Sequence, residues 1–190
     1  MICISPKNRM EIILAAVLLT GSLALEVRAD VKPPPVISLG VFSNLKVTKE
    51  HQYGAEVRLW RQGKAVFGLF SYAEGLTGDT PVGLLEDLHF NMKSGQIFFR
   101  AKLTTWQHFC KIHHGLPSHD LFTFRGVLNK DLLSGKLDRY DVLHPEKQPM
   151  EEQVVLKRRA LATDSLPTFQ SRSQWDKEAN EILRLRGPKW

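Results

Sequence analysis

The residues best suited to chemistry gather in one short segment of the chain, and they carry imidazole and thiol groups: His108, Cys110, His113, His114 and His119. Zinc and copper prefer imidazole and thiolate ligands, so this segment is a candidate metal site. Its spacing fits no strict ligand pattern, however, and a polar connecting loop explains the same residues. A metal-binding or redox function is therefore kept as an alternative.

Cys110 is also a candidate nucleophile, because His108 or His113 could act as the base that forms its thiolate. A single free cysteine more commonly packs as a small apolar side chain, which is what we expect of Cys110. The other cysteine, Cys3, lies in the N-terminal segment, so one thiol remains beyond it and no intrachain disulfide is expected.

Common catalytic signatures do not occur in the sequence. It contains no G-x-S-x-G elbow, no phosphate-binding glycine loop and no H-E-x-x-H motif. Glu86 and Asp87 are adjacent, so they would face opposite sides of a strand and could not act on one bond together. We therefore name no catalytic residue, lean away from an enzyme, and expect no cofactor unless the alternative metal site is real.

The N-terminal segment has the pattern of a secretory signal peptide. Two basic residues precede an apolar run at 12–25, and Val27 and Ala29 occupy the small-residue positions before a cleavage site. The run is shorter than the ~20 apolar residues that a spanning helix needs. We expect cleavage of residues 1–29, export to the periplasm or the exterior, and no transmembrane segment after processing.

Charge adds little to the choice of partner. The chain has a formal net charge of +6, and three cations against two carboxylates in the signal leave +5 on the remainder. A charge of this size is ordinary for a soluble protein. Because export separates the protein from nucleic acid, we expect no nucleic-acid partner.

From Leu39 to Arg159 apolar and polar residues alternate with a period of two, which is typical of half-buried strands. Residues 55–60 and 66–72 flank a tight turn and form the clearest hairpin. Short connections make successive strands antiparallel neighbours, and closure removes both exposed edges. The sequence predicts a mainly β fold, in which an antiparallel meander of seven to eight strands closes into a barrel.

The period changes to that of a helix after Pro167. Ser173-x-x-Asp176 is a capping pattern at the start of this segment. An apolar stripe that includes Trp175 and Ala179 runs from there and ends before Gly187. We expect one C-terminal amphipathic helix packed on the barrel. Its basic end supports a second alternative, an envelope interaction module that uses this helix.

These patterns divide the chain into four parts. They are a signal peptide at 1–29, an extended Pro-rich lead at 30–38, the barrel at 39–160, and a linker with the helix at 161–190. An eight-stranded barrel has room for packed side chains or one small ligand. The side chains expected to line such a cavity are Phe67, Leu69, Ile97, Phe99, Phe124 and Leu128.

Gly40-Val41-Phe42 in the first strand, the meander, and the helix after the last strand together resemble the lipocalin or avidin type of closed barrel. The resemblance is one of architecture, and the shared tripeptide covers only the first strand, where lipocalins have tryptophan at the position of Phe42. No binding residue is carried over. It implies a non-catalytic binder of a small, largely apolar molecule. We therefore expect a monomeric, exported barrel that binds a small hydrophobic ligand or an envelope protein.

Overall fold

A computed structural model describes residues 33–76, 80–103, 120–160 and 169–186. The expected signal peptide lies outside the described residues. So do the five candidate metal ligands His108, Cys110, His113, His114 and His119.

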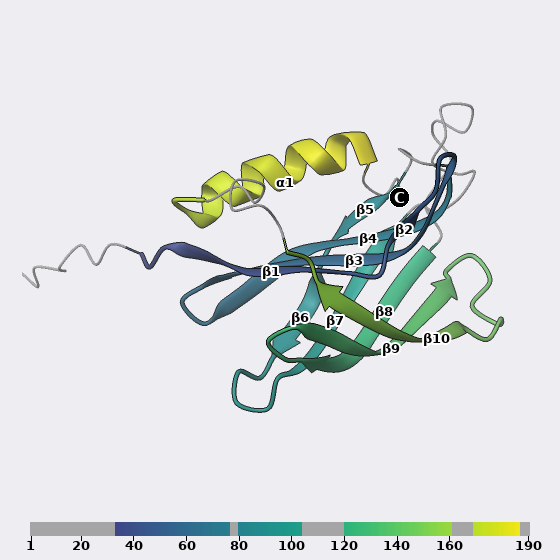
Figure 1. Ribbon diagram of the computed structural model, residues 1–190, viewed down its shortest axis with the longest axis horizontal. Helices are drawn as coiled ribbons and strands as arrows, with labels where there is room; N and C mark the ends of the chain where they lie inside the picture. The colour runs from purple at the N-terminus through teal and green to yellow at the C-terminus, as the bar shows by residue number, and fades with distance from the viewer. Residues whose placement is uncertain (1–32, 77–79, 104–119, 161–168, 187–190) are drawn as a thin grey trace, which may run out of the picture. The chain divides into compact units, whose positions relative to one another are not determined.

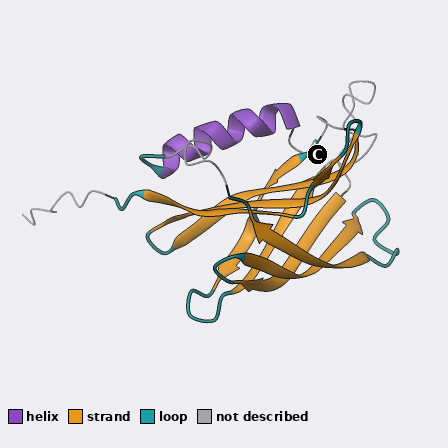
Figure 2. Ribbon diagram, viewed as in Figure 1, coloured by secondary structure: helices purple, strands orange, loops and turns teal. Residues whose placement is uncertain are grey.

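Ten antiparallel strands and one helix make up the described chain (Figures 1 and 2). The elements are β1 (Val36–Ser43), β2 (Lys46–Val47), β3 (His51–Gln62), β4 (Ala65–Leu76), β5 (Val82–Leu84), β6 (Glu86–Phe90), β7 (Gln96–Leu103), β8 (Asp120–Leu128), β9 (Leu132–Asp141), β10 (Met150–Arg158) and α1 (Arg172–Arg186). The strand order is β5-β4-β3-β1-β10-β9-β8-β7-β6, with β2 paired to β3. The predicted mainly β meander with a C-terminal helix is confirmed.

The sheet closes nearly into a barrel through one bent segment. β5 and β6 stand at opposite ends of the strand order, yet only Leu85 separates them in sequence. β5 pairs with β4 and β6 pairs with β7. The Leu85 N–H donates to the Gly68 carbonyl at 3.0 Å, and Asp87, at φ 48°, lies at a bulge beside this change of partner.

The predicted count of seven to eight strands was too low. The excess comes from the division of residues 82–90 at Leu85 and from the two-residue strand β2. A single residue at which a strand changes partner leaves no turn signal, so the sequence pattern predicts one strand for residues 82–90. β1 also begins at Val36, inside the segment expected to be an extended lead.

Phenylalanine rings occupy the centre of the barrel. Burial along β7 alternates as expected, with the side chains of Ile97, Phe99, Ala101 and Leu103 facing inward. The ring centroids of Phe99 and Phe124 are 5.0 Å apart, and those of Phe70 and Phe99 are 5.8 Å apart. Such offset aromatic pairs add stability beyond the area that they bury.

The β3–β4 hairpin connects this interior to a second apolar cluster outside the barrel. Its strands pair along their full length, from His51 opposite Leu76 to Gln62 opposite Ala65. The inner face carries residues such as Phe70, whereas Trp60 and Phe67 lie on the outer face. Both faces of the hairpin therefore bury large side chains.

α1 covers the outer face of this hairpin and of β5 (Figure 1). Trp175 lies 4.6 Å from Phe67 and 5.7 Å from Trp60 between ring centroids, and Ala179 is buried in the same cluster. The apolar stripe of the helix is thus covered by the sheet. A partner of the kind envisaged for an interaction module would meet the other faces of α1.

The N-terminal cap of α1 differs from the expected one. The Ser171 hydroxyl accepts the Gln174 N–H at 3.2 Å, and the Gln174 side chain accepts the Gln170 N–H at 2.8 Å. Ser171, not Ser173, is therefore the cap, and Ser173 lies in the first turn. Over the described ranges, no helix combines the length and hydropathy that a bilayer crossing requires.

Candidate functional site

The six residues expected to line one cavity lie in two different places. Ile97, Phe99, Phe124 and Leu128 belong to the interior of the barrel. Phe67 and Leu69 lie on the opposite face of β4, in the cluster beneath α1. Because both faces of β4 are apolar, alternation alone does not tell which face is the inner one.

The interior positions pack against one another. Phe99 and Phe124 stack with an interplanar angle of 19°, and both are almost completely buried. The rings of Phe70 and Phe122 belong to the same cluster, and their centroids are 5.3 Å apart. These rings fill the centre of the barrel, whereas the described residues form a cleft on its outside.

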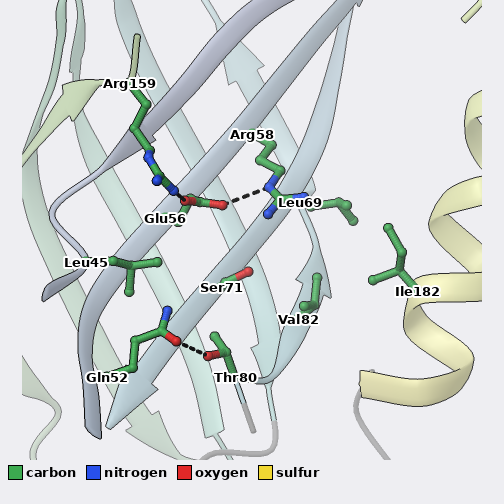
Figure 3. Close-up of a pocket in the computed structure, with 10 residues that line it drawn as sticks. All are labelled: Leu45, Gln52, Glu56, Arg58, Leu69, Ser71, Thr80, Val82, Arg159 and Ile182. Carbon is green, nitrogen blue, oxygen red and sulfur yellow. Dashed lines mark hydrogen bonds and ion pairs between the residues drawn. The ribbon is translucent and has the colours of Figure 1, made fainter. Parts of the chain in front are cut away.

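The cleft has a volume of about 450 Å³ and lies between the outer face of β3, β4 and β5 and the helix α1 (Figure 3). Its lining consists of Leu45, Gln52, Glu56, Arg58, Leu69, Ser71, Thr80, Val82, Arg159 and Ile182. Small-molecule sites in proteins commonly have volumes of roughly 300–1,000 Å³. The cleft is therefore large enough for a small ligand.

Strand register places polar and apolar groups side by side in this cleft. Glu56 on β3 is opposite Ser71 on β4, which is opposite Val82 on β5. Arg58 and Leu69 form the next cross-strand pair on the same face. Directly opposite residues have Cβ atoms only about 4.5–5.5 Å apart. A polar floor, formed by Glu56, Arg58 and Arg159, therefore adjoins an apolar wall, formed by Leu69, Val82 and Ile182.

Glu56 is the centre of the polar floor. Its side chain is 3% exposed, although it lies on the outer face of the sheet. The carboxylate accepts from Arg58 Nε at 2.8 Å and from Arg159 Nη1 at 3.2 Å. The two arginine side chains remain 45% and 55% exposed. A buried carboxylate thus holds two accessible guanidinium groups at one side of the cleft.

Sequence reasoning missed this site. In the sequence, Glu56 is one of several polar residues that alternate with apolar neighbours in the strand at 55–60. Arg159 lies 103 positions further along the chain, so no local spacing connects the two. The pairing of β1 with both β3 and β10 brings the ends of the barrel sequence together and creates the contact.

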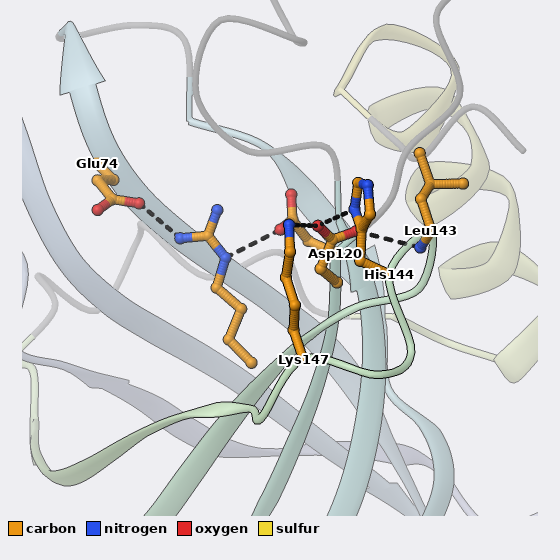
Figure 4. A network of polar contacts seen from close by, with 7 residues as sticks. Glu74, Asp120, Leu143, His144 and Lys147 are labelled. Atoms are coloured by element: carbon orange, nitrogen blue, oxygen red, sulfur yellow. Dashed lines mark hydrogen bonds and ion pairs between the residues drawn. The ribbon is translucent and has the colours of Figure 1, made fainter.

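A second polar network lies at one end of the barrel (Figure 4). Arg139 on β9 donates from Nε to Asp120 at 2.9 Å and from Nη1 to Glu74 at 2.7 Å. Burial lowers the pKa of Arg139, but the two carboxylates outweigh it and hold that pKa above its ordinary value. Nearby, the Asp141 carboxylate contacts His144 Nδ1 at 2.7 Å and Lys147 Nζ at 3.7 Å.

These contacts pair each carboxylate with at least one basic side chain, as expected of a structural network that neutralises charge. Within the part of the chain that the structure describes, no three His, Cys, Asp or Glu side chains are grouped closely enough to hold a metal ion. The candidate ligands between positions 108 and 119 remain a prediction.

The described chain is thus a nearly closed antiparallel barrel with a covering helix and a cleft between the two. Comparisons with protein families, with curated proteins and with solved structures find no match for it.

Proposed function

We propose that this protein is a non-catalytic binding barrel that holds a small, largely apolar molecule in the cleft beneath α1. The observation that carries the proposal is the cleft itself, in which Leu69, Val82 and Ile182 form an apolar wall of suitable size. Small-molecule sites combine apolar walls with fixed polar groups, and four apolar residues of this lining adjoin six polar or charged ones. The packed phenylalanine rings of the interior favour this outer position over the centre of the barrel.

The chemistry of the lining also supports binding without catalysis. The ten lining residues include neither histidine nor cysteine, and the buried carboxylate of Glu56 is engaged by two arginines. Glu56 is the one lining residue that could act as a base toward the hydroxyl groups of Ser71 and Thr80, and both of its carboxylate oxygens already accept from arginine. A nucleophilic mechanism would need this carboxylate free to accept the hydroxyl proton.

Export is part of the proposal. Its support is the basic start, the short apolar run and the small residues before Asp30. An exported barrel that carries a small ligand agrees with the lipocalin-type architecture that the sequence resembles.

Titration of the purified protein with the uncharged dye Nile red tests the proposal. We expect saturable binding that Ile182→Glu weakens about ten- to a hundredfold, because a charge replaces an apolar contact worth roughly 1.5–3 kcal/mol. Val155→Glu is the matched control, since Val155 on β10 is exposed and does not line the cleft. Circular dichroism verifies that each variant is folded.

Dye binding that is unaffected by Ile182→Glu in a folded protein would contradict the proposal. So would an equal loss in both variants, since this would place the dye on general surface rather than in the cleft.

A further inference from the structure

We infer that the cleft selects an amphiphile with a single carboxylate headgroup, which binds to Arg58 and Arg159 while its apolar chain lies along the wall of the cleft. This inference rests on the proposed function, because it specifies the ligand of the same site.

The charges of the polar floor favour an anion. Two guanidinium groups meet one buried carboxylate, so the group of three carries one excess positive charge. A guanidinium has five N–H donors, and Arg58 and Arg159 each direct one of them to Glu56. The remaining donors suit a planar carboxylate, which arginine binds through two parallel hydrogen bonds.

Glu56 also reduces the cost of binding. Its buried carboxylate restrains the two arginine side chains near the cleft, so less rotamer freedom is lost when a ligand arrives. Both arginine side chains remain about half exposed, so a headgroup can reach them. The arrangement therefore resembles a prepared anion site rather than a closed structural ion pair.

The apolar wall begins where the charged floor ends. Leu69 is the direct cross-strand partner of Arg58, and Val82 and Ile182 extend the apolar lining towards α1. A ligand that satisfies both surfaces must join an anionic head to an apolar chain. The single excess positive charge matches a carboxylate better than a phosphate monoester, which carries about −1.5 to −2 at neutral pH.

Isothermal titration calorimetry with three ligands of equal chain length tests this inference. Dodecanoate has a carboxylate head, dodecanol has a neutral head and dodecyltrimethylammonium has a cationic head. We expect dodecanoate to bind most tightly and the cation most weakly. Arg159→Gln and Arg58→Gln should each weaken dodecanoate binding about tenfold or more, with little change for dodecanol.

Arg184→Gln is the matched control, because Arg184 is exposed on α1, pairs with Glu181 and does not line the cleft. Equal binding of dodecanoate and dodecanol, or an equal effect of Arg159→Gln on both, would overturn the inference and leave the proposed function standing. If neither the three ligands nor the dye binds, the inference and the proposed function are both wrong.

Discussion

Glu56 is a carboxylate on the outer face of β3 that its surroundings bury to 3% exposure. Burial of an unpaired carboxylate is expensive, and only close ion pairs and hydrogen bonds compensate for it. Arg58 and Arg159 provide this compensation from two different parts of the chain. These ion pairs compensate for the burial of the Glu56 carboxylate. They also hold the guanidinium groups of Arg58 and Arg159 in place, and the inferred recognition of a headgroup depends on these two groups.

Tyr72 is a residue whose surroundings predict a pH dependence of stability. Burial raises the pKa of Tyr72, and the carboxylates of Glu152 and Glu74 raise it further, against an opposing effect of Arg139. The folded protein thus favours the neutral phenol. Its contribution to stability is complete below the unfolded pKa of about 10 and is lost as pH rises through the folded pKa.

We expect ultraviolet titration of the folded protein to show a phenol that ionises later than an ordinary tyrosine, and Tyr72→Phe to remove this late step. Tyr53→Phe is the control, because Tyr53 is 48% exposed. A late step that persists in Tyr72→Phe would contradict the assignment.

At the scale of elements, α1 depends on tertiary packing more than on its own sequence. A helix of 15 residues is marginal in isolation, so burial of its apolar stripe must stabilise it. Trp175 is the largest side chain of this stripe, and its ring contacts Trp60 and Phe67. The sequence shows the stripe but does not show which surface receives it.

Trp175→Ala is therefore expected to lower the free energy of unfolding by about 3–5 kcal/mol, the usual effect of removing a large buried aromatic side chain. Urea unfolding measures the loss, and hydrogen exchange should show faster exchange in α1 than in β7. Lys177→Ala, at an exposed position of the same helix, should change stability little. If Trp175→Ala is as stable as Lys177→Ala, the docking of α1 does not depend on this side chain.

The elements differ in how far the sequence could predict them. The β3–β4 hairpin and the alternation along β7 follow from local patterns, because one turn and one buried face decide them. The inner face of β4 could not be predicted, since Phe67 and Phe70 on its two faces are equally apolar. The site depends on Arg159 meeting Glu56, which only the closed topology of the sheet brings about.

At the scale of the whole molecule, the barrel depends on a close approach at the segment that joins its two edges. A Cβ atom added at Gly83 in β5 would lie 2.4 Å from the Lys102 carbonyl oxygen of β7. Such a distance is not tolerated without a shift of the backbone. Gly75 in β4 provides a contrast, because no atom lies within 4 Å of a Cβ added there.

Gly83→Ala should therefore destabilise the protein by about 1–3 kcal/mol, the usual range for overpacking, and should speed hydrogen exchange in β5 and β7. Gly75→Ala is expected to be neutral or to stabilise the fold slightly, because alanine restricts the unfolded chain. Urea unfolding compares the two variants directly. Equal stability would mean that β5 can move away from β7 at little cost, so that the close approach at Gly83 contributes little to the stability of the barrel.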